Sequence, residues 1–244
     1  MSEITESKSR LRNRVWDVLE RERIAPHGGR GRIPAFVGAE LAADRLAELP
    51  AWRAASVIKA VPDRAQQPVR ARALRERKIV CMAAPRLAAP QPFCLLDPER
   101  LAGEPAAIAE RHAAVEAGRP VSTAEMQPVD MVVCGSVAVG YTGARLGKGA
   151  GYTDIEAALL QEAGLIGEQT LMVTTVHDAQ VLDQEIPEGE HDFRVDVIVT
   201  PTRTIHATAP RRSRGILWHL LSEEAIMSIP ALGNRQDRPR HGAR

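Results

Sequence analysis

The sequence predicts an α/β fold in which a largely parallel sheet lies between layers of helices. Apolar, strand-like runs alternate along the chain with segments that suit helices, the order typical of three-layer α/β proteins. Runs such as 131–133 and 195–199 consist almost entirely of Met, Val and Ile, which indicates strands buried on both faces. A chain of 244 residues has room for one large α/β domain or two small ones. We expect a single domain over residues 1–232, followed by a disordered tail at 233–244 that is polar and contains Pro and Arg.

The first predicted element is an amphipathic helix that ends before Pro26. Its apolar residues follow the helical spacing i, i+4, i+7 and i+8, namely Leu11, Val15, Val18 and Leu19. A polar, glycine-rich loop at 26–35 then leads to a second helix at 37–49. The remaining pattern predicts strands at 55–61, 78–83, 130–134, 170–176 and 194–200, with helices near 67–77, 105–117 and 154–163.

Composition excludes several classes of protein. The 32 basic and 31 acidic residues leave a net charge of +1, so we expect neither a nucleic-acid partner nor a membrane partner. The arginines at 70–77 alternate with Ala and Leu and are interpreted as the solvated face of a helix. Three widely spaced cysteines form neither a disulfide framework nor a zinc motif. A polar start without a signal-peptide pattern, and the lack of an apolar run near the ~20 residues of a membrane span, predict a cytoplasmic protein.

Residues 145–154, R-L-G-K-G-A-G-Y-T-D, carry the strongest functional signal. Gly147, Gly149 and Gly151 leave the backbone free to turn several N–H groups toward one anion. Lys148 lies between two of these glycines, although the chain has only four lysines against 28 arginines. The loop follows a predicted strand and precedes a predicted helix, whose N-terminus favours negative charge. We interpret the loop as a phosphate cradle, with an ordinary surface turn as the alternative.

The loop fits neither of the two most familiar phosphate motifs. A Walker A loop needs four residues between its glycines and a Ser or Thr after the lysine, whereas Gly143 is followed by three residues and Lys148 by Gly149. The dinucleotide fingerprint has a wider glycine spacing and follows its strand directly. The sequence around Ser136 also lacks the Gly-x-Ser-x-Gly pattern of a hydrolase elbow.

The extended pattern R-L-G-K-G-x-G-Y-x-D, preceded by D-M-V-V-C-G-S-V-A-V at 130–139, resembles the signature of the 5-formyltetrahydrofolate cyclo-ligase family. The resemblance spans about residues 8–205 and includes K-x-x-L-R-x-x-V-W at 8–16, Pro85-Arg86, Gln180, Pro187 and the strand-like run at 191–200. Likeness at 33–36, 62–63 and 215–218 is greatest to the divergent branch named methenyltetrahydrofolate synthase domain-containing proteins.

The resemblance implies an ATP-dependent ligase that converts 5-formyltetrahydrofolate to 5,10-methenyltetrahydrofolate. In this reaction the formyl oxygen attacks the γ-phosphoryl group, the neighbouring nitrogen closes on the activated carbon, and phosphate leaves. The fold implied is cyclo-ligase-like, with a Rossmann-like arrangement of strands and helices. The partners implied are ATP, Mg²⁺ and a reduced-folate-like small molecule, with the protein a monomer or a weak homo-oligomer.

The resemblance also assigns roles to residues of this chain. The ATP-binding residues would be Lys8, Arg12, Arg145, Leu146, Gly147, Lys148, Gly149, Ala150, Gly151, Tyr152 and Thr153. Lys148 and Arg145 would be catalytic, and the segment Lys148, Gly149, Ala150, Gly151 and Tyr152 would also contact the substrate. Asp154 and Asp192 would share the Mg²⁺, which prefers hard oxygen ligands.

Structural alternatives remain open for several of these residues. Asp154 could be an acidic residue in the first turn of a helix that the helix dipole alone stabilises. Asp192 could be an ordinary polar residue at the start of a strand. Lys8 and Arg12 lie four residues apart and fit a solvated helix face equally well. Gln180 could simply satisfy backbone groups in a loop. The pair His177-Asp178 could serve a metal or acid–base role, but it is interpreted as structural.

One departure from the family pattern concerns the folate half of the site. The family carries a Gly-Glu pair after the strand equivalent to 55–61, and its glutamate binds the pterin. This chain has K-A-V-P-D-R at 59–64, where Asp63 is the nearest carboxylate. Thr153 replaces a second tyrosine, and only eight aromatic residues of the Phe, Trp and Tyr types occur. The alternative is therefore that the chain is a divergent nucleotide-binding protein. It would then act on another heterocyclic substrate or have a non-catalytic regulatory or interaction role.

Overall fold

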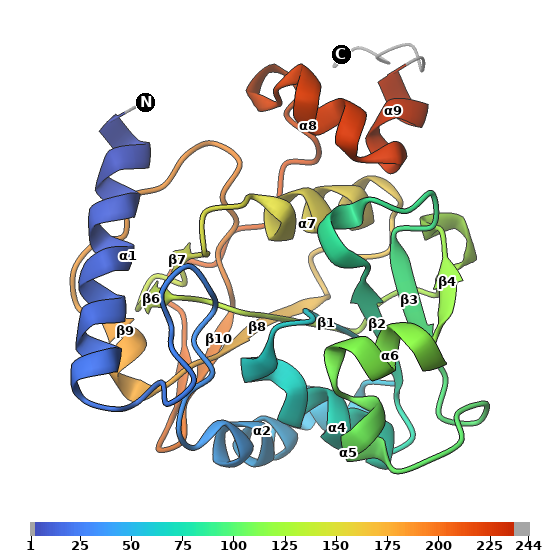
Figure 1. Ribbon diagram of the computed structural model, residues 1–244, viewed down its shortest axis with the longest axis horizontal. Coiled ribbons are helices and arrows are strands. Elements are labelled where there is room, and N and C mark those ends of the chain that lie inside the picture. Colours follow the sequence, from blue (N-terminus) through green and yellow to red (C-terminus); the bar gives the residue numbers. More distant parts are fainter. Residues whose placement is uncertain (1–2, 237–244) are drawn as a thin grey trace.

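The computed structural model of the chain describes residues 3–236. Its centre is an eight-stranded sheet of order β11-β10-β8-β5-β1-β2-β3-β4 (Figure 1). The inner strands β10, β8, β5, β1 and β2 run parallel, whereas β3, β4 and β11 join antiparallel at the edges. The strands are β1 (Val57–Ala60), β2 (Ile79–Ala83), β3 (Phe93–Leu96), β4 (Arg119–Val121), β5 (Met131–Cys134), β8 (Leu171–Thr175), β10 (Val197–Val199) and β11 (Thr204–His206). The predicted fold class, a largely parallel sheet between helices, is confirmed.

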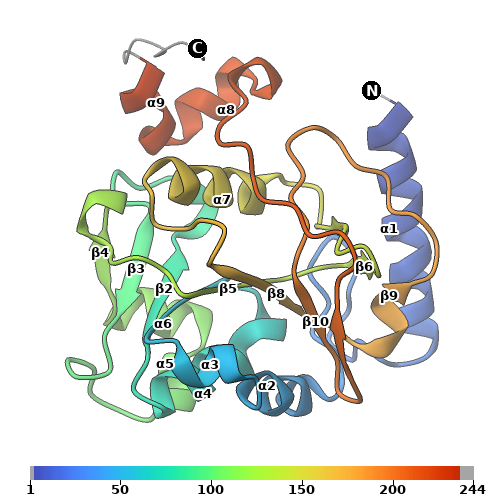
Figure 2. The same ribbon diagram turned by 180° about the vertical axis from the view of Figure 1, so that it is seen from behind.

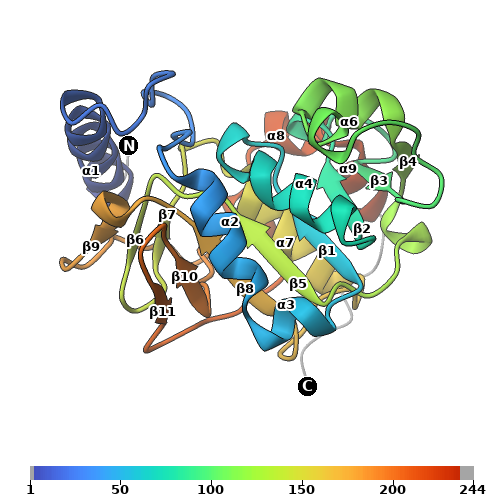
Figure 3. The same cartoon turned by 90° about the horizontal axis from the view of Figure 1, so that it is seen from below.

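Helices cover both faces of this sheet. Helix α7 lies on one face, and α2, α3 and α4 lie on the opposite face (Figures 1 and 3). Helices α8 and α9 pack beyond α7, on the side away from the sheet (Figure 2). The helices are α1 (Glu3–Arg21), α2 (Ala39–Ala47), α3 (Pro50–Ala54), α4 (Gln67–Arg75), α5 (Pro105–Ile108), α6 (Arg111–Ala117), α7 (Tyr152–Glu162), α8 (Glu223–Ser228) and α9 (Pro230–Gln236). Short 3₁₀ turns occur at Arg64–Gln66, Pro85–Leu87, Thr123–Glu125, Asp178–Gln180 and Trp218–Leu220.

A small second sheet joins helix α1 to the rest of the fold. It has the order β7-β6-β9 and lies beside α1 (Figure 1). Its strands are β6 (Ala138–Gly140), β7 (Arg145–Leu146) and β9 (Val181–Leu182). Leu11 and Val15 of α1 belong to the same buried cluster as Leu146 of β7. This packing fixes the first helix next to the segment that leads into the glycine loop.

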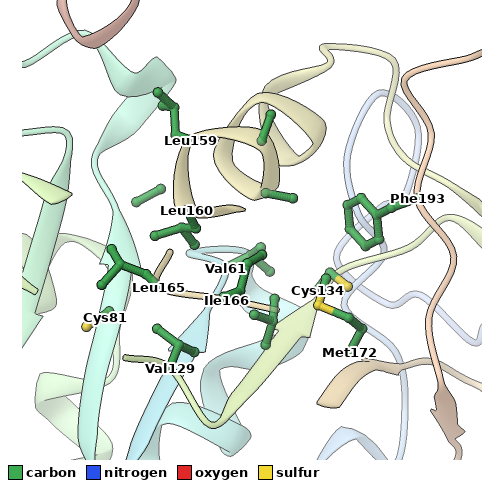
Figure 4. Packing of buried hydrophobic residues seen from close by; sticks show 14 of the residues in the cluster. Val61, Cys81, Val129, Cys134, Leu159, Leu160, Leu165, Ile166, Met172 and Phe193 are labelled. Atoms are coloured by element: carbon green, nitrogen blue, oxygen red, sulfur yellow. The ribbon is translucent and has the colours of Figure 1, made fainter. Parts of the chain in front are cut away.

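The core divides into two layers because side chains of a strand alternate between the faces of the sheet. Val57 and Val61 of the β1 segment belong to the cluster beneath α7, whereas Ile58 and Ala60 belong to the cluster beneath α2 and α4. Figure 4 shows the first layer, in which Leu160 of α7 packs toward the sheet. Burial on both faces agrees with the continuous apolar runs in the sequence. Along residues 3–236, no helix combines the length and the apolar character that crossing a membrane requires.

The structure also differs from the sequence predictions in several places. The predicted helix at 105–117 is divided into α5 and α6, because the Glu110 carboxylate accepts hydrogen bonds from the amides of His112 and Ala113 and begins a new helix. Residues 233–236 continue α9 rather than starting the predicted tail. The rest of that tail, 237–244, lies outside the described residues.

The interpretation of the arginines at 70–77 as a solvated face is wrong for Arg70, which is only 1% exposed. Its guanidinium donates to the carbonyl oxygens of Val61, Asp63 and Ala109 at 2.5 to 3.1 Å. Burial lowers the pKa of Arg70 to about 10, although Asp63 and Glu110 oppose the shift. Arg70 therefore ties the chain that follows β1 to the junction of α5 and α6.

Replacing Arg70 with leucine is expected to lower the free energy of unfolding by about 3 kcal/mol, since buried carbonyl groups lose their donors. Chemical denaturation followed by circular dichroism measures the change. The exposed Arg75 lies on the same helix, so Arg75→Leu is the matched control and is expected to change stability by less than about 0.5 kcal/mol. Equal stability of the two variants would contradict the assigned role of Arg70.

The three cysteines are free and buried. Burial raises the pKa of Cys81 to about 12 and that of Cys94 to about 11, and it also raises the pKa of Cys134. The thiolate is the reactive form, so the folded protein is expected to resist alkylation at pH 8. Mass spectrometry after iodoacetamide treatment should find almost no label on the folded protein and three labels after unfolding in guanidinium. Rapid labelling of any folded-state cysteine would contradict this packing.

Candidate active site

A cavity of about 930 Å³ lies at the carboxyl ends of β1 and β2. Residues 61–63 after β1 and 84–86 after β2 form one side, which is where open α/β sheets bind ligands. Helix α1, the glycine loop and the first two turns of α7 form the other side. All the residues predicted for the site line this cavity: Lys8, Arg12, Arg145, Leu146, Gly147, Lys148, Gly149, Ala150, Gly151, Tyr152, Thr153, Asp154 and Asp192.

The glycine loop connects β7 directly to the N-terminus of α7. Arg145 and Leu146 are the strand, and the loop proper begins at Gly147. Gly149 and Gly151 have φ angles of +102° and +72°, a region that other residues adopt only with strain. Gly151 is the N-cap of α7 and offers no side chain to satisfy the first amides of the helix. The amide of Asp154 bonds the carbonyl oxygen of Gly151, whereas those of Tyr152 and Thr153 remain available to an anion in the cavity.

Helix α1 brings two cations to the loop. Lys8 is 8% exposed and forms an ion pair with the Asp192 carboxylate, while Arg12 donates from Nε to the carbonyl oxygen of Gly147 at 2.8 Å. Burial lowers the pKa of Arg12, and the charge of Asp192 opposes that shift. Both side chains therefore point into the protein, which excludes the alternative that they form a solvated helix face.

Arg145 and Asp154 form a second ion pair inside the site. The Arg145 guanidinium lies 2.7 Å from the Asp154 carboxylate and 4.4 Å from the centre of the Phe193 ring, and its side chain is 3% exposed. Burial alone would lower the pKa of Arg145, but attraction to Asp154 outweighs it and the pKa is raised. Arg145 Nε has no hydrogen-bond partner in the described part of the chain. Arg145 is thus a permanent cation that fixes Asp154 at the cavity wall.

Asp154, Asp192 and His191 place one ligand atom each within 4.8 Å of one another. Asp154 uses Oδ1 for Arg145, and Asp192 uses Oδ2 for Lys8 and the amide of Gly189. Each carboxylate keeps its other oxygen clear of these contacts. Two converging hard oxygens suit Mg²⁺, so the residues present fit the metal that the sequence implied. His191 was not predicted, because its neighbour Asp192 alone carries the motif.

Sequence reasoning missed several contacts of this cavity. Lys148 Nζ lies 3.2 Å from an oxygen of Asp63, the carboxylate after β1. Lys59 of β1 and Glu156 of α7 form a buried ion pair, and Glu156 lines the cavity. Arg111, at the start of α6, also lines it. These contacts join elements far apart in the chain, and no local spacing signals them.

The residues interpreted as structural lie away from the cavity chemistry. Gln180 is buried and donates to the carbonyl oxygens of Ser136 and Val137. His177 accepts from the amide of Ala179, and Asp178 accepts from the hydroxyl of Thr200. These bonds order the turn between β8 and β9.

The chain is similar to known proteins along most of its length. The model of the 5-formyltetrahydrofolate cyclo-ligase family matches residues 4–201. Methenyltetrahydrofolate synthase domain-containing proteins of Mus musculus and Homo sapiens are 38% and 35% identical over 98% and 95% of the chain. The chain spans only 65% and 62% of the length of these two relatives.

A solved structure shows the same fold. The NMR structure of Aquifex aeolicus 5,10-methenyltetrahydrofolate synthetase aligns with a TM-score of 0.53 and 21% identity, covering 88% of this chain and 98% of that protein. The family match covers most of the chain, and the sequence relatives align along nearly all of it. The chain belongs to the 5-formyltetrahydrofolate cyclo-ligase family.

Proposed function

We propose that the protein is an ATP-dependent ligase that converts 5-formyltetrahydrofolate to 5,10-methenyltetrahydrofolate in this cavity. The observation that carries the proposal is the convergence of the glycine loop, the N-terminus of α7 and the side chains of Lys8, Arg12 and Lys148 on one cavity. Membership of the cyclo-ligase family supports the reaction class. We expect the protein to act in the cytoplasm as a monomer or a weak homo-oligomer.

The phosphate groups of ATP would bind at the glycine loop. The amides from Gly147 to Thr153 and the α7 dipole favour an anion there. Lys148 is 40% exposed at its side chain and is free to exchange Asp63 for a phosphate oxygen. Arg145 and Lys148 would neutralise the charge that develops on the transferred group, which is the main demand of phosphoryl transfer.

Asp154 and Asp192 would hold Mg²⁺ through the oxygens that Arg145 and Lys8 leave open. Of these, Oδ1 of Asp192 lies 3.8 Å from Nε2 of His191. When bound, the ion would offset phosphate charge and orient the phosphate oxygens. Arg145 and Lys8 hold the two carboxylates in position through these ion pairs. Tyr152, half-buried in the first turn of α7, would separate the nucleotide from the heterocycle.

The reaction balances with the two substrates alone. The formyl oxygen attacks the γ-phosphorus of ATP, the bond to the β,γ-bridging oxygen breaks, and ADP leaves. The neighbouring secondary amine nitrogen of the folate then attacks the activated carbon and gives up its proton, and inorganic phosphate leaves with the former formyl oxygen. The contribution of the protein is to position the reactants and to stabilise charge.

Purified protein incubated with ATP, Mg²⁺ and 5-formyltetrahydrofolate should develop the near-ultraviolet absorbance of the methenyl product. Omission of ATP or Mg²⁺ is expected to abolish the signal. Intact ATP binding without turnover at high protein concentration would overturn the substrate assignment. That result would favour another heterocyclic substrate or a non-catalytic role, for which the Pro62-Asp63 pair in place of the family's Gly-Glu pair already argues.

A further inference from the structure

Beneath the cavity lies a buried ion pair that the phosphate chemistry does not use. Lys59 and Glu156 contact each other with side chains only 1% and 7% exposed. Lys59 belongs to β1, where its position between Val57 and Val61 turns it toward α7. Glu156 belongs to the second turn of α7. The pair therefore bridges the central sheet and the helix that starts at the glycine loop.

The pair lies between the buried α7 layer of the core and the charged residues of the cavity wall. Lys59 is close enough to influence the titration of Cys81 and Cys134, both of which are buried in the α7 layer of the core. Desolvation makes buried ion pairs expensive, and well-packed apolar side chains often replace them without loss of stability. Stability alone therefore gives no reason for two charges here, whereas a binding role does.

Glu156 lines the cavity, and Lys59 does not. Lys59 donates a hydrogen bond to Oε2 of Glu156, and within residues 3–236 no hydrogen bond reaches the other carboxylate oxygen, Oε1. Every other carboxylate that lines the cavity pairs with a cation, either near the glycine loop or at the protein surface. The pairs are Asp63 with Lys148, Asp154 with Arg145, Asp192 with Lys8, and Glu190 with Arg214 and His219. Glu156 is thus a fixed acceptor in the wall of the cavity, held from the core side.

We propose that Glu156 determines specificity by accepting hydrogen bonds from the N–H edge of an aminopyrimidinone-type heterocycle. An exocyclic amino group beside a ring N–H presents two donors side by side, and a carboxylate is the matching acceptor. Lys59 is the positioning residue that holds the carboxylate in its orientation. The inference rests on the proposed function, and it places the heterocycle-recognising carboxylate on α7 rather than after β1.

The test measures binding by isothermal titration calorimetry in the presence of a non-hydrolysable ATP analogue. The ligands are 5-formyltetrahydrofolate and its 2-desamino analogue, which lacks the amino donor. Glu156→Gln is expected to weaken binding of 5-formyltetrahydrofolate at least tenfold and to leave affinity for the ATP analogue within twofold. The exposed Glu168 follows the same helix, so Glu168→Gln is the matched control and should change neither affinity.

Two further measurements test the role of Glu156 even if Glu156→Gln folds poorly. The double variant Lys59→Met/Glu156→Leu removes both charges and should lose the same affinity. The desamino analogue should bind the wild-type protein at least tenfold more weakly than the natural compound, and the double variant should no longer distinguish the two ligands.

The outcomes separate this inference from the proposed function. Turnover of 5-formyltetrahydrofolate with an unchanged KM in Glu156→Gln, or equal wild-type affinity for both ligands, would overturn the role of Glu156 and leave the reaction standing. Binding of the ATP analogue without binding of either folate would overturn the inference together with the substrate assignment. Binding without turnover, lost in Glu156→Gln, would uphold Glu156 and overturn the reaction.

Discussion

Replacing Lys148 with alanine is expected to lower kcat/KM for ATP by about 100-fold or more, the usual effect of removing one group that stabilises transition-state charge. Lys148 lies in the glycine loop, and its ammonium group is the most exposed of the cations that we assign to the phosphates. Its contact with Asp63 is partly exposed, so the substitution should leave the fold stable. Initial rates at varied ATP concentration measure the effect.

Two controls separate this role from a general effect of charge. Arg64 is exposed near Asp63 and does not line the cavity, so Arg64→Ala should retain activity. Lys148→Arg keeps the charge on a larger, planar group and should recover part of the lost activity. Unchanged ATP affinity and turnover in Lys148→Ala would show that the loop is an ordinary surface turn.

Replacing Lys59 with methionine is expected to lower the free energy of unfolding by about 3–5 kcal/mol, because Glu156 then keeps a buried charge without its partner. Lys59 is 1% exposed in the central strand β1, where water cannot easily compensate the carboxylate. Chemical denaturation at pH 7 gives the change in stability.

The double variant Lys59→Met/Glu156→Leu tests the origin of that loss. Removing both charges should recover most of the stability, since apolar side chains then fill the space. The same variant is expected to bind 5-formyltetrahydrofolate poorly. Recovered stability together with lost binding would show that the ion pair serves ligand binding rather than the stability of the fold. A double variant less stable than Lys59→Met would mean that Glu156 does more for the fold than its ion pair accounts for.

The inner strands could be predicted from the sequence because burial on both faces requires continuous apolar residues. β5 (Met131–Cys134) and β10 (Val197–Val199) show that pattern plainly. The strands that were missed are the edge strands and the two- or three-residue strands of the small sheet, such as β7. Their pairing depends on partners distant in the chain, so local composition carries little signal for them.

Of the site, the contiguous part could be predicted from the sequence, and the long-range contacts could not. The glycine loop is a contiguous motif, and the structure places every residue assigned to it around one cavity. The ion pairs join residues as distant as Lys8 and Asp192, and only the fold brings these together. Arg70 illustrates the converse error, because its sequence neighbours suggest a solvated helix face while its side chain anchors the loop after β1.

Phosphorylation of the formyl oxygen can be followed with 5-formyltetrahydrofolate that carries ¹⁸O in the formyl group. Single-turnover reaction with ATP and Mg²⁺, followed by mass spectrometry of the released phosphate, reports the fate of that oxygen. We predict one ¹⁸O in the inorganic phosphate for each methenyl product formed. Unlabelled phosphate would show that water, rather than the formyl group, takes the phosphoryl group, and would contradict the proposed reaction.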